Sequence, residues 1–288
     1  MAIVGRIVDI WRYPVKSMRG ERRPSAVLAA AGVIGDRGWA LRDERAGEIR
    51  GAKKLPALLQ CAARYLAEPA ATGAMPPAEV TLPDGALVRT DDPAAATRLS
   101  AVVGRPITLW PLQPAALADH YRRAAPDNPD MVAELREIFG RLPDEPLPDL
   151  SVFPPELMQY TSPPGTYFDA FPLHLLSTSS LAALQARTPG ARIDVRRFRP
   201  NLLIEPASAA PGFVELAWCG KILRAGTARI RVEIPCVRCV MTTLAQGELP
   251  REPAVLRTIV REAAQNVGVY ASVAQPGVVA VGDPVSVE

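Results

Sequence analysis

The chain has 288 residues, of which 48% are hydrophobic, and a formal net charge of +3 at pH 7. This length can bury a full core in one or two domains, and the small net charge argues against nucleic acid as a partner. No apolar run approaches the ~20 residues that cross a bilayer, the N-terminus lacks the pattern of a signal peptide, and the four cysteines suit a reducing compartment. The sequence therefore predicts a cytoplasmic protein that binds neither nucleic acid nor membrane.

The basic residues are concentrated in two places. The first 54 residues carry 12 basic and 6 acidic side chains, and a second cluster comprises Arg192, Arg196, Arg197 and Arg199. Such local clusters favour a small anionic ligand. Because arginine outnumbers lysine 29 to 4 in the whole chain, a scatter of arginines over the solvated surface is the alternative interpretation.

The N-terminal part of the chain is predicted to be mostly β. Residues 3–15 alternate apolar and polar side chains, so Lys16 and Ser17 should lie just past a strand. Further strands are expected at 39–42, 80–82, 86–89 and 106–110, the first of them after a glycine-punctuated turn at 32–38. Asp92 is expected to cap a short helix that Gly104 ends.

Residues 113–165 have a different composition. A short helix is expected at about 128–139, stopped by Gly140, and prolines are dense in the rest of the segment. Proline removes backbone donors and blocks regular structure, so the segment is predicted to be a wrapping connection or a linker.

Beyond residue 165, short strands are expected to alternate with two helices. Ser177 or Thr178 can cap a helix that Gly190 ends, and a second, amphipathic helix is expected at about 252–266. Strands are expected at 202–205, 213–218, 222–224 and 227–234, with a last strand ending at Val285. Many short strands with few helices predict a mainly β fold with appended helices (the α+β class), built from barrel-like β domains.

The pair Cys236 and Cys239 is the most informative feature of the sequence. It follows an alternating strand pattern, and Pro235 is expected to end that strand because proline lacks a donor for the sheet ladder. The cysteines should then lie on a turn at a strand end. A thiolate there is a soft metal ligand, and Arg238 between the cysteines would help to keep it deprotonated.

Three ordinary explanations compete for the cysteine pair. A structural zinc site needs four ligands, but Cys61 and Cys219 stand alone, and His120 and His174 are far apart in the sequence. A thioredoxin-like pair would open a helix, which residues 240–244 do not resemble. Two buried and inert cysteines are the third explanation.

Several stretches of the chain resemble the MOSC-domain family, named for the C-terminal domain of molybdenum cofactor sulfurase. The matching stretches are 13–17 with 35–39, 163–169 with 173–184, 198–204, 235–243 and 276–285. They occur in the order of the family and cover nearly the whole chain. The resemblance implies a MOSC N-terminal β-barrel-like domain at 1–115, a proline-rich connection with a short helix at 116–165, and a MOSC β-barrel domain at 166–288, the two domains packed together.

The functional analogue that the resemblance implies is the amidoxime-reducing component, a molybdenum enzyme that reduces N-hydroxylated compounds. In that family the second cysteine of the loop binds molybdenum, so Cys239 is the expected metal ligand and catalytic residue, and Cys236 is expected to pack. The implied cofactor is molybdenum-molybdopterin, whose terminal phosphate requires cations and backbone donors. By motif match, its binding residues are Lys16, Ser17, Arg37, Lys53, Ser177, Thr178, Arg199, Asn201 and Arg238. For Ser177 and Thr178, plain capping of a helix is an equal alternative.

The implied function is the reduction of N–O or S–O bonds in small molecules by removal of oxygen. Electrons would come from a separate protein of the flavin reductase, ferredoxin or cytochrome type. The turn after Thr243 is shorter and less charged than in the amidoxime-reducing enzymes, so the sequence leaves the substrate open. The alternatives are a carrier of molybdenum cofactor or of persulfide sulfur, and a module that binds some other anion.

Overall fold

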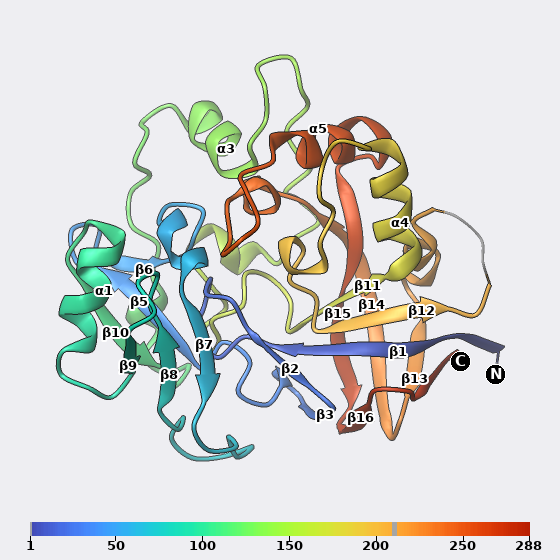
Figure 1. The fold of residues 1–288 in the computed structure, drawn as a ribbon, viewed down its shortest axis with the longest axis horizontal. Helices are drawn as coiled ribbons and strands as arrows, with labels where there is room; N and C mark the ends of the chain where they lie inside the picture. Colours follow the sequence, from blue (N-terminus) through green and yellow to red (C-terminus); the bar gives the residue numbers. More distant parts are fainter. Residues whose placement is uncertain (1, 209–211) are drawn as a thin grey trace.

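The computed structural model describes residues 2–208 and 212–288 (Figure 1). Within these residues seven strands close into a barrel, because one strand pairs with both ends of the sheet. In order around the barrel they are β12 (Leu202–Pro206), β11 (Leu173–Ser177), β15 (Asn266–Gln275), β14 (Ala228–Val237), β13 (Ile222–Ala225), β17 (Pro284–Val287) and β1 (Ala2–Arg12), which pairs back to β12. The short strand β2 (Glu21–Arg23) extends the sheet from β1. The predicted mainly β class with appended helices is confirmed.

The N-terminal strand β1 belongs to this barrel although it opens the chain. It is hydrogen-bonded to β12 on one side and to β17 on the other. Its residue Ile7 pairs with Ile204 and is fully buried in the barrel core. A Cβ on Gly5 would lie only 2.4 Å from the carbonyl oxygen of Glu205, so glycine permits the close approach of β1 to β12. The first strand of the chain is therefore held by strands from its C-terminal half.

The described residues also form three smaller sheets (Figure 1). They consist of β10 (Ile107–Pro111), β5 (Trp39–Asp43) and β6 (Glu48–Arg50); of β16 (Gly277–Ala280), β3 (Ser25–Ala29) and β4 (Gly32–Val33); and of β7 (Ala62–Tyr65), β8 (Ala78–Thr81) and β9 (Leu87–Arg89). A second core joins two of these sheets to the 3₁₀ helix η1 (Pro56–Gln60) and to α1 (Ala95–Val103). Helix α1 ends at Gly104 in the left-handed conformation, as expected. The hairpin predicted for residues 80–89 is formed by β8 and β9.

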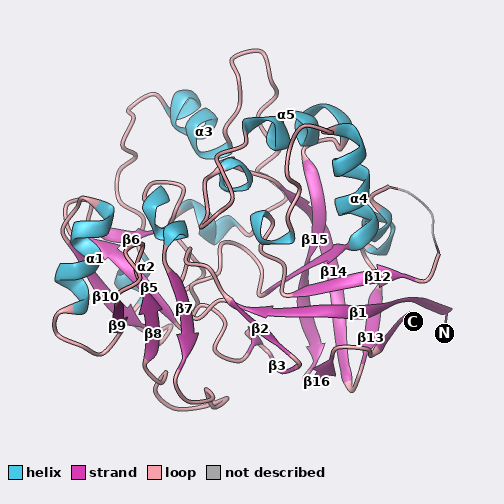
Figure 2. Ribbon diagram, viewed as in Figure 1, coloured by secondary structure: helices cyan, strands magenta, loops and turns pink. Residues whose placement is uncertain are grey.

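Two helices, α4 (Thr178–Arg187) and α5 (Pro253–Glu262), cover one side of the barrel (Figure 2). Ser177 caps α4, its hydroxyl accepting from the backbone N–H of Ser180 at 3.1 Å. Glu252 caps α5 by accepting from the N–H of Ala254. Helix α5 ends four residues before the expected position, because the chain turns into β15 at Asn266. Helix α4 likewise ends at Arg187, before Gly190.

The connection expected at 116–165 contains α2 (Ala118–Tyr121), α3 (Met131–Phe139) and the 3₁₀ helix η2 (Pro155–Met158). Helix α3 begins slightly later than expected because Asp130 caps it, accepting from the N–H of Val132 at 2.9 Å. Glu134 of α3 pairs with Lys54 at 2.8 Å, which ties the connection to the N-terminal sheets. No helix of the described residues has the length and apolarity that crossing a membrane requires.

The strand predicted at 213–218 is wrong. Residues 214–218 form the 3₁₀ helix η4 (Val214–Trp218), and its buried residues, Glu215 and Trp218, are three apart rather than two. The carboxylate of Glu215 accepts from the hydroxyl of Ser180 at 2.6 Å and from the N–H of Gly268 at 3.1 Å. A buried carboxylate needs such donors, and the helical turn places the Glu215 carboxylate within hydrogen-bond distance of them.

The predicted strand end at Pro235 is also wrong. Strand β14 continues to Val237, and Pro235 is paired with Val269 of β15 between two shifts of register. An irregular register accommodates a residue that cannot donate to the ladder. Cys236 therefore lies within the strand, and only Cys239 lies beyond its end.

Candidate active site

The cysteine loop joins β14 to the 3₁₀ helix η5 (Val240–Thr243). Its first cysteine, Cys236, is 2% exposed, and its second, Cys239, is partly exposed. The backbone N–H of Arg238 donates to the carbonyl of Gln265 at 2.9 Å, which holds the loop against the start of β15. Residues 240–243 form one 3₁₀ turn, shorter than the α-helix of a thioredoxin-like site. The four cysteines are free, and Cys61 lies in the N-terminal core.

Cys236 and Cys239 have different surroundings. The Arg238 guanidinium donates from Nη1 to the Cys236 sulfur at 2.9 Å. Burial nevertheless raises the pKa of the Cys236 thiol, and Arg238 only partly opposes this shift. Cys236 is thus a packed, protonated thiol, which leaves Cys239 as the thiol open to a ligand.

Arg238 is the buried cation of the loop. Its Nη2 donates to the carbonyl of Phe198 at 2.8 Å, and its Nη1 lies 3.4 Å from His174 Nε2. Burial, and then the charge of Arg238, lower the pKa of His174 well below its ordinary value, so the imidazole is neutral. Arg238 Nε is buried and has no hydrogen-bond partner among the described residues. Sequence reasoning missed His174, which only the register of β11 brings to this place.

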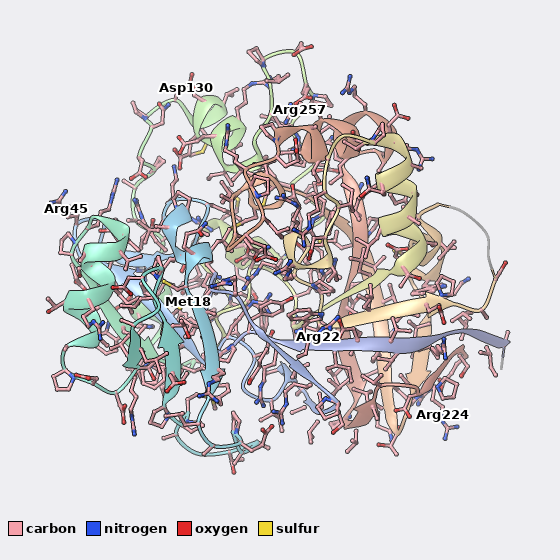
Figure 3. All side chains as sticks on the ribbon, viewed as in Figure 1. Met18, Arg22, Arg45, Asp130, Arg224 and Arg257 are labelled. Carbon is pink, nitrogen blue, oxygen red and sulfur yellow. The ribbon has the colours of Figure 1, made fainter. Side chains whose placement is uncertain are left out.

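A second buried cation, Arg199, lies over the ring of Tyr13, with 4.2 Å from its guanidinium carbon to the ring centroid. Its Nη1 donates to the carbonyl of Met18 at 2.7 Å (Met18 is labelled in Figure 3). Its Nη2 is buried without a partner in the described part of the chain. Burial lowers the pKa of Arg199 to about 10. Arg199 and Arg238 therefore each hold an N–H donor that the protein leaves unsatisfied.

Asn201 uses its side chain inside the protein. Its Nδ2 donates to Asp36 at 3.1 Å, and its Oδ1 accepts from the N–H of His174 at 3.1 Å. Asp36 also accepts from the N–H of Tyr13 at 2.8 Å and pairs with Arg37. Asn201 thus holds Asp36 and β11 in place, and a direct contact with a ligand edge stays a prediction.

Lys16 and Lys53 share one carboxylate. Lys16 Nζ lies 2.7 Å from Asp169 Oδ1, and Lys53 Nζ lies 3.0 Å from Asp169 Oδ2. Burial would raise the pKa of Asp169, but the two lysines hold it well below its ordinary value. Burial would lower the pKa of Lys53, but Asp169 and, to a smaller extent, Cys239 hold it above its ordinary value. Lys53 therefore lies within electrostatic reach of Cys239. Asp169 was missed as a site residue, although it ends the motif at 163–169.

Backbone strain is concentrated around these residues. Among the described residues, the non-glycine residues with positive φ are Ser17 (67°), Arg37 (53°), Arg199 (56°), Ala264 (44°) and Gln265 (71°). Three of them are expected cofactor-binding residues, and Gln265 holds Arg238. A left-handed conformation costs on the order of 1–3 kcal/mol for such residues, which are held by the surrounding structure and cluster at functional sites.

Ser177 and Thr178 lie at the end of β11 and the start of α4, away from the cluster around Arg199 and Arg238. Ser177 is three residues along β11 from His174, a distance of about 10 Å for a strand. Its hydroxyl contacts Glu215 and the hydroxyl of Ser180. The structure therefore does not bring Ser177 to the cluster around Arg199 and Arg238, and its contacts are those of a helix cap. A ligand contact for either residue stays a prediction.

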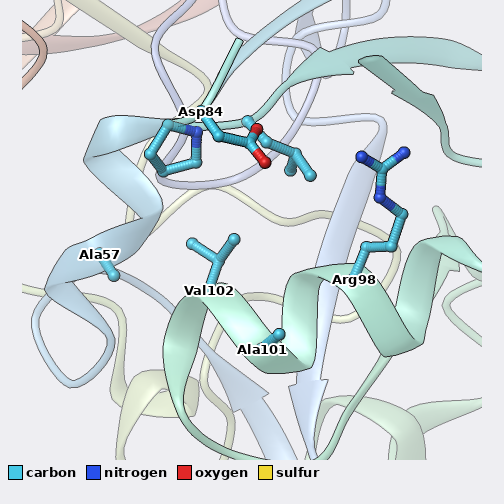
Figure 4. A pocket seen from close by; sticks show the side chains of 7 residues that line it. Ala57, Asp84, Arg98, Ala101 and Val102 are labelled. Atoms are coloured by element: carbon cyan, nitrogen blue, oxygen red, sulfur yellow. The ribbon is translucent and has the colours of Figure 1, made fainter. Parts of the chain in front are cut away.

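The donor set fits a phosphate-bearing cofactor. Each of two buried guanidinium groups has an N–H donor without an acceptor, which is unfavourable. A bound anion would accept from these donors and remove that penalty. Lys16 and Lys53, which share Asp169, and Arg37, which pairs with Asp36, are further cations of the site, and the partly exposed Cys239 follows Arg238 in the chain. A separate surface hollow beside α1, lined by Ala57, Leu82, Pro83, Asp84, Arg98, Ala101 and Val102, contains none of these residues (Figure 4).

Comparison with known proteins identifies two family profiles and several relatives that match this chain. The MOSC domain profile matches residues 163–286, and the profile of the MOSC N-terminal beta barrel domain matches residues 4–101. Over 132 residues, 41% of this chain and 37% of the relative, the chain is 34% identical to mitochondrial amidoxime-reducing component 1 of Xenopus laevis. Over 133 residues, 41% of this chain and 38% of the relative, it is 30% identical to mitochondrial amidoxime reducing component 2 of Bos taurus. The matched stretch thus spans less than half the length of these curated relatives. Among solved structures, the YuaD protein of Bacillus subtilis matches 98% of this chain and 94% of its own length, with a TM-score of 0.45 and 12% identity.

Proposed function

Because this chain is a MOSC-domain protein with a MOSC N-terminal β-barrel domain ahead of its MOSC domain, we propose that it is a molybdenum-cofactor reductase. Its substrates are small molecules with N–O or S–O bonds. The observation that supports this most is that two of the four buried side-chain nitrogens without a hydrogen-bond partner in the described residues, Arg199 Nη2 and Arg238 Nε, belong to expected cofactor-binding residues, one of which directly precedes Cys239. The names of its relatives, amidoxime-reducing components, support a reductase.

In this proposal Cys239 is the protein ligand of molybdenum. Cys236 is less suited to that role because it is 2% exposed and its sulfur already accepts from Arg238. When bound, the cofactor supplies two-electron chemistry with transfer of oxygen. Arg199, Arg238 and the lysine pair bind its phosphate and the acceptors of its pterin, because fixed guanidinium donors recognise planar and anionic groups.

The remaining residues of the site hold these groups in place. Asn201 and Asp36 keep the strained turn at Arg37 against Tyr13. His174 accepts from Arg238, and because its imidazole is neutral it adds no positive charge beside the guanidinium. We assign proton delivery to solvent. Electrons come from a separate protein of the flavin reductase, ferredoxin or cytochrome type, and the setting is cytoplasmic.

The test is the molybdenum content of wild type, Cys239→Ser and Cys236→Ser, measured by plasma mass spectrometry after production in a host that makes the cofactor. We expect nearly stoichiometric metal in wild type and in Cys236→Ser and its loss in Cys239→Ser. Absence of molybdenum from wild type despite cofactor supply would refute the reductase. Sulfane sulfur on Cys239 would then support the persulfide carrier.

A further inference from the structure

The carboxylate of Asp169 bridges two lysines that are expected to bind the anionic part of the cofactor. Each of its oxygens contacts a different lysine, Oδ1 at 2.7 Å from Lys16 and Oδ2 at 3.0 Å from Lys53. Phosphate oxygens bind paired cations in the same way. The side chain of Asp169 is 52% exposed, whereas that of Lys16 is 7% exposed. The anion of this triad is thus the member nearest to solvent.

The two acidic residues near the cations are held differently. Asp36 is 4% exposed and accepts from the N–H of Tyr13 and from Asn201 in addition to its pair with Arg37. Asp169 has no side-chain partners in the described part of the chain other than the two lysines. Lys16 also donates to the backbone carbonyl of Tyr167 at 2.6 Å, a contact that does not involve the side chain of Asp169. When Asp169 leaves, Lys16 is still held by the carbonyl of Tyr167, whereas Lys53, which has no other hydrogen-bond or ion-pair partner among the described residues, exchanges Asp169 for the incoming anion.

We propose that Asp169 is an internal counter-ion that an incoming phosphate group displaces from Lys16 and Lys53. It stabilises the lysine pair before the ligand binds, and it lowers the affinity for the ligand because its contacts must be broken first. Anions with a single weak charge would fail to displace it, so Asp169 selects for phosphate esters. This inference rests on the proposed function only in assigning the phosphate to a cofactor.

Pyrophosphate is the probe, and Asp169→Asn is the variant. Calorimetry on the cofactor-free full chain should show the variant binding pyrophosphate about five- to tenfold more tightly, because a partly exposed ion-pair cluster no longer has to be broken. Without pyrophosphate the variant should melt at a lower temperature than wild type. With saturating pyrophosphate the two should melt together, since Asp169 then has no contacts to lose in either protein.

The matched control is Glu68→Gln. Glu68 also bridges two cations, Arg12 at 2.6 Å and Arg23 at 2.8 Å, and it is 61% exposed. This variant should melt lower with and without pyrophosphate and bind the probe as wild type does. The inference is overturned if Asp169→Asn stays less stable at saturation, if its affinity is unchanged, or if neither protein binds pyrophosphate. These readouts need no molybdenum, so its absence would refute the proposed function and leave them unaffected.

Discussion

Arg141 donates from Nη2 to the backbone carbonyl of Arg238 at 2.9 Å, and Arg238 directly precedes Cys239. The same nitrogen donates to Gln265 Oε1 at 2.9 Å, and the carbonyl of Gln265 accepts from the N–H of Arg238. Both ends of the Arg238 backbone are therefore held. Because Arg141 lies in the connection at 116–165, that segment helps to position the cysteine loop.

Arg141→Lys should loosen this loop. Lysine cannot make the forked contact, so we expect a loss of about 1–3 kcal/mol in the free energy of unfolding and a lower molybdenum content. Urea titration and metal analysis measure the two effects. Arg136→Lys is the control, because Arg136 also donates to a backbone carbonyl, that of Glu145, but does not contact the cysteine loop. Equal metal loss in both variants would contradict the role of Arg141.

Arg199→Met should separate stability from ligand binding. Replacing an incompletely paired buried cation by an apolar side chain is often neutral or stabilising, so the unfolding free energy should change by less than about 1 kcal/mol. The affinity for pyrophosphate should fall by at least about tenfold, which corresponds to ~1.4 kcal/mol for a lost charge-assisted hydrogen bond. Chemical denaturation and calorimetry test both statements. A variant that binds as wild type does would remove Arg199 from the anion site.

His174 should make the protein sensitive to mild acid. Its native pKa lies well below 6.5, so the unfolded state takes up a proton first as the pH falls. The free energy of unfolding should therefore be unaffected by this group above about pH 7 and should decrease as the pH falls through about 6.5. In His174→Gln that part of the decrease should disappear. Urea titrations at a series of pH values, on both proteins, measure the difference, and parallel curves would contradict the assignment.

The two cysteines of the loop should react at different rates. Cys239 is partly exposed, whereas Cys236 is 2% exposed and burial raises the pKa of its thiol. Iodoacetamide should therefore modify Cys239 at least about tenfold faster, since Cys239 is more accessible and burial keeps the Cys236 thiol protonated. Peptide mass spectrometry over a time course follows both sites. Cys61, which is also buried with a raised pKa of about 11, is the internal reference for a slow thiol.

Ser177→Ala should affect stability alone. The variant loses the cap of α4 and a donor to buried Glu215, which should cost about 1–2 kcal/mol of unfolding free energy. Thr178→Ala, one residue further on and without such contacts in the described chain, should cost less than about 0.5 kcal/mol. Neither change should alter pyrophosphate binding. A loss of binding in either variant would restore the hydroxyl to the anion site.

Much of the fold could be predicted from local pattern. The β-rich halves, the hairpin formed by β8 and β9, the proline-rich connection and both covering helices follow from alternation, turn residues and caps, and the family profiles confirm the MOSC resemblance. The errors arose where tertiary contacts outweighed local preference. Buried Glu215 accepts from donors of α4 and β15, and these contacts stabilise residues 214–218 as a helical turn. An irregular register with β15 lets β14 continue through Pro235.

The sequence by itself determined which chemistry the chain carries: a pair of cysteines with arginine between them, and cations at Lys16, Arg37 and Arg199. Those residue types and spacings are local properties of the chain. Only the tertiary structure decided that Cys236 is buried and Cys239 partly exposed, and that Asp169 joins two lysines. It also decided that Ser177 caps α4 and lies about 10 Å along β11 from His174. Burial and pairing depend on which strands meet and in which register, and closure of the barrel sets both.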